Sequence, residues 1–294
     1  MLKIERKLIG FVEKHMYLLC ALLCSLLALY LRKIAVWWSY GSVAAYFDMH
    51  SNYTQTVTYY LLVRLTQYLP LLPLHSIKWL AGLADFGIAG LVVFLLGRET
   101  SAAKRLIFFL ACLFSPILFL RGITWGQIDS IGIFLLLTGY AIHIKNQSKN
   151  EKYRKWVAMA PVIFAVALCP WLLLIVIVFL WHMNERQIDF WLKILLLSVG
   201  VFAVQFISTA LLQVSWKESF FTLVRFLTYN PESGERYGNA IEWMLQLLCL
   251  YGPAASLLTL LAAGRRKFPY MWAILIQIIA TVLCGTYLFR EFIS

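Results

Sequence analysis

The stretch Arg121-Gly122-Ile123-Thr124-Trp125-Gly126-Gln127-Ile128-Asp129-Ser130 decides how this chain is interpreted, because it joins two long apolar runs. It places an arginine and an aspartate at the same predicted membrane border, between segments that carry almost no charge. Ionisable side chains near a membrane span tend to face polar cavities rather than lipid. We therefore expect a polar site at this border, held in place by the helices on either side of it.

The composition is typical of a membrane protein. Of the 294 residues, 62% are apolar and 14% are charged, whereas about a quarter of the residues of soluble domains are charged. Apolar windows recur along the chain and are long enough to cross about 30 Å of hydrocarbon as helices. Strand-type alternation is absent, and lipid-exposed backbone must satisfy its own hydrogen bonds. The sequence predicts an all-α polytopic membrane protein, with one transmembrane domain over residues 1–294.

The net charge of +12 does not indicate a nucleic-acid partner. Its basic residues fall in short loops between apolar runs, and such loops carry their excess of positive charge on the cytoplasmic side. This distribution predicts a multi-pass protein of the cell membrane, with a cytoplasmic N-terminus and a C-terminus outside. About nine spans are expected, at residues 15–31, 77–97, 106–121, 127–144, 156–168, 171–182, 192–213, 241–263 and 268–289.

Three polar segments are expected to share the outer face. Residues 32–76 are too often interrupted to cross and too aromatic for a free loop, so interfacial helices on the outer leaflet are predicted there. Residues 214–240 form a second outer segment, and the stretch from Arg121 to Ser130 is the third. Residues 156–182 either cross twice or form a re-entrant pair broken at Pro170, and both alternatives leave this sidedness unchanged.

Within the third segment, helix initiation explains some residues and leaves one unexplained. Thr124 and Gln127 have the spacing of a capping box, which predicts that they begin the following span. Capping does not explain Asp129, which is expected one turn inside the helix, where the helix dipole favours negative charge. Gly126 has no side chain, which lets a ligand approach the backbone. Asp129 is therefore a candidate functional residue.

Trp125-Gly126-Gln127-Ile128-Asp129-Ser130 resembles the Trp-Gly-Gln-x-Asp signature of GT-C-type integral membrane glycosyltransferases. The group it is most similar to comprises the GPI mannosyltransferases and their bacterial relatives. Asp48 matches the acidic residue that these enzymes carry in their first outer segment, and residues 237–243 resemble their Asn-Ala-x-x-x-Trp element. The chain departs from the family at Cys169, where a lysine is frequent, and at residues 52–54, which replace Tyr-Pro-Pro.

The resemblance implies a hexosyltransferase of the cell envelope with a GT-C-like fold. It would move a sugar, such as mannose, from a polyprenyl-phosphate donor to a glycan or glycolipid acceptor at the outer face. An inverting transfer needs a carboxylate that takes the acceptor's proton, and Asp48 is the candidate. Asp129 would share this task, orient the acceptor, or hold a divalent cation with Asp48.

The leaving group of this reaction is a lipid phosphate, whose developing charge is stabilised by fixed cations. Arginine binds phosphate with two parallel hydrogen bonds, although a headgroup anchor is the alternative for each arginine here. Asp85 is expected to pair with a neighbouring helix or to line a cavity, with a structural pair favoured. The predicted substrate-binding residues are Arg121, Trp125, Gly126, Gln127, Arg225, Arg236, Tyr237 and Asn239.

Two other functions fit the same sequence. A flippase or transporter for lipid-linked sugars also places charged groups within helices, although no inverted repeat is detected. A non-catalytic, GT-C-like subunit of a glycan assembly complex would keep the scaffold without activity, which the short chain and the missing Lys-Pro pair favour.

Overall fold

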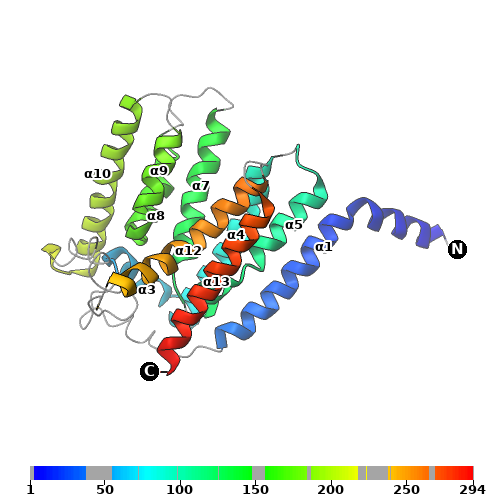
Figure 1. Ribbon diagram of the computed structural model, residues 1–294, viewed down its shortest axis with the longest axis horizontal. Helices are drawn as coiled ribbons and strands as arrows, with labels where there is room; N and C mark the ends of the chain where they lie inside the picture. The colour runs from blue at the N-terminus through cyan, green and yellow to red at the C-terminus, as the bar shows by residue number, and fades with distance from the viewer. Residues whose placement is uncertain are drawn as a thin grey trace.

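Long apolar helices lie side by side in a computed structural model of the chain (Figure 1). The structure describes residues 3–37, 55–71, 73–97, 99–124, 126–147, 156–183, 187–217, 223, 238, 240–264 and 269–293. All regular elements within these residues are helical. The helices are α1 (Lys3–Trp37), α3 (Val57–Thr66), α4 (Pro73–Leu96), α5 (Ala102–Leu113), α6 (Pro116–Leu118), the π-helix η1 (Phe119–Thr124), α7 (Asp129–Gln147), α8 (Met159–Leu168), the 3₁₀-helix η3 (Pro170–Leu172), α9 (Leu173–Met183), α10 (Gln187–Leu212), α12 (Ala240–Gly264) and α13 (Tyr270–Ile293).

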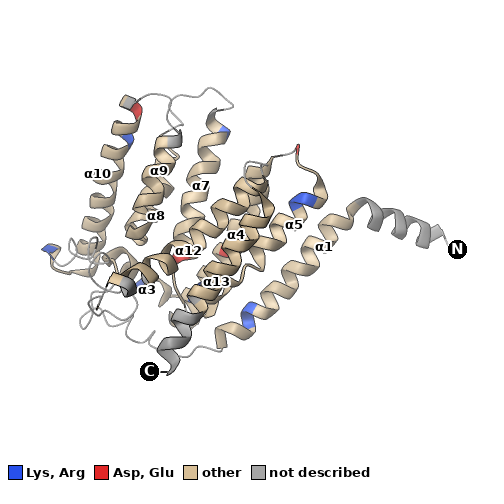
Figure 2. Ribbon diagram, in the orientation of Figure 1, with Lys and Arg blue, Asp and Glu red and all other residues tan. Residues whose placement is uncertain are grey.

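Five segments in the described part of the chain are long and apolar enough to cross a membrane. Lysine, arginine, aspartate and glutamate are sparse along these helices, as Figure 2 shows. Three further apolar helices are shorter, so the prediction of nine spans stays a prediction. The chain is an all-helical, multi-pass membrane protein by these criteria. The five segments are His15–Trp37, Leu74–Leu96, Ala102–Thr124, Ile188–Leu212 and Trp243–Gly264.

Helix α1 extends further than the sequence predicts. The first span was expected to end at residue 31, before a basic pair in the outer segment 32–76. Instead the helix continues to Trp37, because Arg32 is buried among neighbouring helices rather than exposed to water. The indole of Trp37 packs against the imidazole of His75, with ring centroids 5.0 Å apart. The end of α1 therefore lies beside the beginning of α4.

Helix α3 lies within the segment predicted to carry interfacial helices. Thr56 caps its N-terminus by accepting a hydrogen bond from the backbone N–H of Tyr59. The buried face of α3 packs against the bundle: Tyr59 and Val63 are in the core, and the hydroxyl of Thr58 lies 3.3 Å from that of Ser208 on α10. One side of this helix is thus fixed to α10.

The predicted break at Cys169 and Pro170 is present. Helix α8 ends at Leu168, and Pro170 begins the short 3₁₀-helix that leads into α9. The fixed φ of proline suits this first helical position, and its missing N–H leaves no helical hydrogen bond unmade there. The break places buried backbone, including Cys169, against the beginning of α7.

The capping box predicted at Thr124 and Gln127 is wrong. The π-helix η1 continues through Thr124, whose hydroxyl donates to the carbonyl of Phe119 at 3.3 Å. Helix α7 begins only at Asp129. Asp129 therefore belongs to the first turn of α7 and does not lie one turn inside it, so its carboxylate is nearer to the positive end of the helix dipole than expected.

Small residues let helices α7 and α8 approach closely, as is common between membrane helices. A methyl group at Gly139 would lie 2.8 Å from the backbone carbonyl oxygen of Ala158, which is too short for an ordinary contact. On α4, a methyl group at Gly90 would meet no atom within 4 Å. The two glycines differ in packing, although both are helical.

We predict that Gly139→Ala destabilises the protein and that Gly90→Ala does not. The first substitution forces α7 and α8 apart, at about 1 to 3 kcal/mol. The second adds a residue with better helix propensity, worth about 1 kcal/mol, in open space. Denaturant unfolding in detergent micelles measures both. Equal stability of the two variants would contradict the close α7–α8 packing.

Candidate functional site

The candidate site lies where the π-helix η1 gives way to α7. The backbone N–H of Gly126 donates to the carbonyl of Gly122 at 2.8 Å, and that of Gln127 donates to the carbonyl of Arg121 at 2.9 Å. Gly126 has a φ of +78°, a left-handed conformation that glycine adopts without strain. Single π-helical turns are frequent at functional sites. This turn folds the chain back so that Arg121 faces the first residue of α7.

Arg121 and Asp129 form a buried ion pair at this turn. The Nε atom of Arg121 lies 2.5 Å from Oδ2 of Asp129, and both residues are 2% exposed. The other carboxylate oxygen, Oδ1, is buried and accepts no hydrogen bond from the part of the chain that the structure describes. The pair thus fixes the carboxylate through one oxygen and leaves the second without a partner. Arg121 is buried and pairs with Asp129, and its predicted role in phosphate binding, with a headgroup anchor as the alternative, stays a prediction.

Lys78 is a third charged residue at the same turn. It is fully buried on the second turn of α4, and its ammonium donates to the carbonyl oxygen of Thr124 at 2.7 Å. The side-chain stem of Lys78 also lies against Gly126, whose missing Cβ would be 3.6 Å from two of its carbons. Cations therefore hold both sides of this turn: Lys78 binds Thr124 at the end of η1, and Arg121 binds Asp129 at the beginning of α7.

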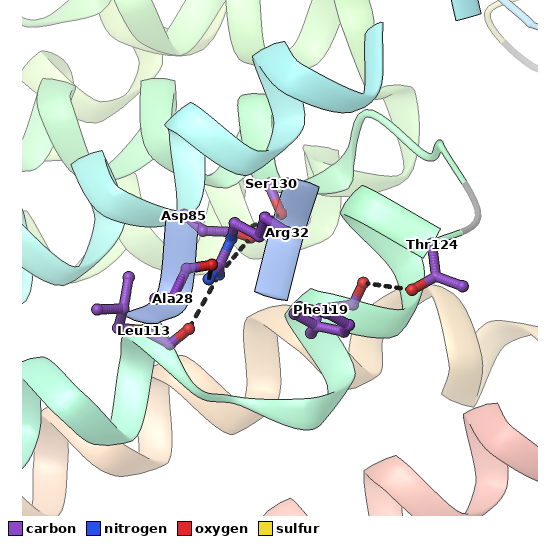
Figure 3. A network of polar contacts seen from close by, with 7 residues as sticks. All are labelled: Ala28, Arg32, Asp85, Leu113, Phe119, Thr124 and Ser130. Carbon is purple, nitrogen blue, oxygen red and sulfur yellow. Dashed lines mark hydrogen bonds and ion pairs between the residues drawn. The ribbon is translucent and has the colours of Figure 1, made fainter. Parts of the chain in front are cut away.

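A second polar network lies one residue further along α7 (Figure 3). Asp85 on α4 accepts a hydrogen bond from the hydroxyl of Ser130 at 2.6 Å and pairs with Arg32 at 2.9 Å. Arg32 also donates to the carbonyl of Leu113, at the end of α5, at 2.9 Å. The network joins α1, α4, α5 and α7. It confirms the expectation that Asp85 pairs with a neighbouring helix.

Aromatic rings shield this second ion pair. The guanidinium of Arg32 lies 5.1 Å from the ring centre of Phe86 and 5.6 Å from that of Phe119. Arg32 is 1% exposed and Asp85 is 0% exposed. A buried pair that is closed in by carbonyl, hydroxyl and aromatic partners stabilises a fixed arrangement of helices.

The break after α8 also reaches the beginning of α7. The thiol of Cys169 lies 3.8 Å from the carbonyl oxygen of Ile128, the residue before Asp129. The chain thus carries a buried, uncharged side chain at the position where the resembling enzymes frequently have lysine. No positive charge comes from this position to the turn.

The structure brings together Arg121, Gly126, Gln127 and Asp129, four of the residues predicted for the site. Gln127 is buried and lies two residues before Asp129, the first residue of α7. The predicted meeting with the other two outer segments is not tested, because Asp48, Arg225, Arg236, Tyr237 and Asn239 lie outside the described part of the chain. Trp125, which belongs to the stretch from Arg121 to Ser130, also lies outside it.

The sequence interpretation missed Arg32, Lys78 and Ser130. Lys78 and Asp85 are seven residues apart, which places them on one face of a helix, so their spacing could have indicated a shared polar environment. Arg32 looked like the end of a span because it is followed by Lys33. Its burial depends on a partner 53 residues away, which no local pattern reveals.

The described residues hold no group of three or more histidine, cysteine, aspartate or glutamate side chains able to bind a metal ion. Asp48 and Asp129, the pair proposed for a divalent cation, are not tested by this result, since Asp48 lies outside the described residues. Asp129 has one buried oxygen without a partner, which is suitable for a hard cation or for a proton donor.

Comparisons with protein-family models, with characterised proteins and with solved structures gave no match to this chain. Its class therefore follows from its own helices and charges: a multi-pass helical membrane protein with two buried ion pairs at the beginning of α7. The resemblance to GT-C-type glycosyltransferases depends on residues 125–130, on Asp48 and on residues 237–243 of the sequence.

We predict that Asp85→Asn destabilises the fold strongly. Removing one partner of a buried ion pair leaves an uncompensated charge, which costs about 3 to 5 kcal/mol. Asp189→Asn serves as the control, because Asp189 is a half-buried aspartate in the first turn of α10 and makes no ion pair with a described residue. Its expected cost is within about 0.5 kcal/mol.

Unfolding in detergent micelles measures this difference. Replacing both partners by apolar residues, with Arg32→Met and Asp85→Leu together, is expected to recover part of the loss, since no charge is then left buried. An Asp85→Asn variant as stable as Asp189→Asn would contradict the role of the network.

Proposed function

We propose that this protein is a glycosyltransferase that moves a hexose from a polyprenyl-phosphate donor to an acceptor at the outer face of the membrane. One observation carries the proposal: Asp129 is buried at the beginning of a helix and is held by Arg121 through one oxygen, while no described residue is bonded to its other oxygen. A carboxylate that served packing alone would cost free energy without both oxygens satisfied. At a reaction centre, the unpartnered oxygen is where a substrate hydroxyl or cation binds.

The proposed reaction exchanges one bond for another at the sugar. The acceptor's hydroxyl oxygen forms a bond to the anomeric carbon, while the bond from that carbon to the phosphate oxygen breaks. The electron pair of the broken bond leaves with polyprenyl phosphate, and the acceptor's proton passes to a carboxylate. Asp48 is the proposed base. Asp129 shares this role, orients the acceptor, or holds a divalent cation with Asp48.

The donor's geometry suits a site at the end of a membrane helix. Its lipid chain lies in hydrocarbon and its phosphate at the border, where the beginning of α7 lies in the proposed topology. Nine spans, a cytoplasmic N-terminus and an outer C-terminus remain part of this proposal. The proposed substrate contacts are Arg121, Trp125, Gly126, Gln127, Arg225, Arg236, Tyr237 and Asn239, and Arg121 also positions Asp129 through their ion pair.

The structure offers less support for the two rival functions. A transporter would use a charged pair in its helices as a moving or exchangeable site. The pair of Arg32 and Asp85 is instead enclosed and hydrogen-bonded to Ser130 and to a backbone carbonyl. A non-catalytic subunit would have no use for the unpartnered oxygen of Asp129, and activity measurements separate it from an enzyme.

We predict that Asp129→Asn abolishes sugar transfer in proteoliposomes. The substitution keeps the shape of the side chain but removes the charge that acts at the reaction centre, and such losses are about a hundredfold or more. It also removes the carboxylate that pairs with Arg121, so a loss of stability is expected beside the loss of transfer. Radiolabelled polyprenyl-phosphate hexoses and a glycolipid acceptor serve as substrates. Asp48→Asn is expected to fail in the same way, whereas Asp189→Asn, with its aspartate in the first turn of another helix, keeps wild-type transfer.

Full transfer by Asp129→Asn would overturn the catalytic assignment. Movement of the donor across the bilayer without transfer would establish the flippase instead. A wild-type protein that neither transfers nor moves the donor would favour the non-catalytic subunit. Melting temperatures of the variants show whether a loss of transfer reflects chemistry or unfolding.

A further inference from the structure

Lys78 is a buried cation that has no role in the proposed reaction. Its residue is 0% exposed, and it lies in the span Leu74–Leu96, where a charged group is costly. An ammonium has three N–H donors. Its ammonium donates a hydrogen bond to a neutral acceptor, the carbonyl of Thr124. Among the described residues, this buried cation has one neutral oxygen as its partner and no carboxylate, an environment that would favour a bound anion.

The other buried cations near this turn each have a carboxylate. Arg32 pairs with Asp85, and Arg121 pairs with Asp129. No described carboxylate lies within ion-pair distance of Lys78. The buried ionised side chains of α1, α4, η1 and the first turn of α7 therefore sum to one excess positive charge.

One negative charge of the right kind comes with the substrate. A sugar linked to a lipid through phosphate is a phosphodiester, which carries one negative charge. When the sugar leaves, the phosphate becomes a monoester, whose charge at neutral pH is about −1.5 to −2. A fixed cation beside this phosphate would bind the donor, and it would bind the developing leaving group more strongly.

The position of Lys78 suits this role. It holds Thr124, which lies between Arg121 and Asp129, so its ammonium is at the same turn as the candidate reacting carboxylate. The break between α8 and α9 also reaches this turn, but its residue there is Cys169, which is buried and uncharged. The break therefore supplies no cation to the turn. Lys78 reaches the turn from α4 instead.

We propose that Lys78 binds the phosphate group of a polyprenyl-phosphate lipid at the beginning of α7. This inference rests on the proposed function for the identity of the lipid. Phosphate on a glycerophospholipid or in solution has the same chemistry, so the experiment must distinguish these sources.

The experiment measures binding without sugar or acceptor. Protein in nanodiscs of phosphatidylcholine is titrated with a fluorescent polyprenyl phosphate and with the matching polyprenol, which lacks the phosphate. The wild-type protein is expected to prefer the phosphate by about tenfold or more, since a charge-assisted hydrogen bond has this strength. Lys78→Met should lose the preference and Lys78→Arg should keep it. Lys33→Met is the control, because Lys33 is an exposed cation near the end of α1 that lies beside the beginning of α4.

Several results would overturn the inference. They are a wild-type protein without preference for the phosphate, a Lys78→Met variant with undiminished preference, and a Lys33→Met variant that loses as much. Competition by phosphatidylglycerol or by inorganic phosphate as effective as that by unlabelled polyprenyl phosphate would assign the site to a headgroup or to a free anion and overturn the choice of lipid. Lys78→Gln replaces Lys78→Met if the latter does not fold.

The failure of this inference and that of the proposed function are distinguishable. Sugar transfer by the wild-type protein together with unchanged lipid binding in Lys78→Met overturns the role of Lys78 alone. Phosphate-selective binding that depends on Lys78, in a protein that transfers no sugar, supports the lipid site and overturns the glycosyltransferase.

Discussion

The carboxylate of Asp85 is the interaction on which the rest of the site depends. It binds Arg32 of α1 through one oxygen and Ser130 of α7 through the other, and Arg32 in turn binds the last carbonyl of α5. These contacts lie in an apolar bundle, where water does not compete for the hydrogen bonds, so they fix the helices relative to one another. Ser130 directly follows Asp129. Holding the first turn of α7 through Ser130 therefore also holds the candidate catalytic carboxylate.

The two ion pairs have different consequences. In the pair of Arg32 and Asp85, both carboxylate oxygens have partners, and the pair is enclosed by aromatic rings. In the pair of Arg121 and Asp129, one oxygen is left without a partner. We interpret the first as structural and the second as the reactive end of the same cluster. The buried lysine beside it supplies the positive charge that a lipid phosphate would neutralise, so the proposed donor completes the charge balance of the site.

Much of the fold could be predicted from the sequence, because long apolar runs report membrane helices directly. The break at Pro170 and the position of Asp129 near Arg121 also follow from local patterns, and an aspartate within an apolar run, such as Asp85, indicates that some partner exists without saying which. The π-helix was not foreseen, since Thr124 and Gln127 have the spacing of a helix start whether or not a helix begins there. Arg32 and Lys78 were missed for a different reason. A charged residue at the end of an apolar run is equally compatible with water and with a buried partner, and only the packing of distant helices decides between them.

The most direct test of the central claim is the side of the membrane on which the site lies. A cysteine at Gln67, the C-cap of α3 in the connection to α4, reports the end of the bundle that carries Lys78 and Asp129. A cysteine at Glu99, just after α4, reports the opposite end. Both residues are exposed. In intact cells, with the native cysteines replaced, an impermeant maleimide is predicted to label the cysteine at Gln67 at once and the cysteine at Glu99 only after the membrane is opened. The reverse pattern would place the site on the cytoplasmic face and contradict transfer at the outer surface.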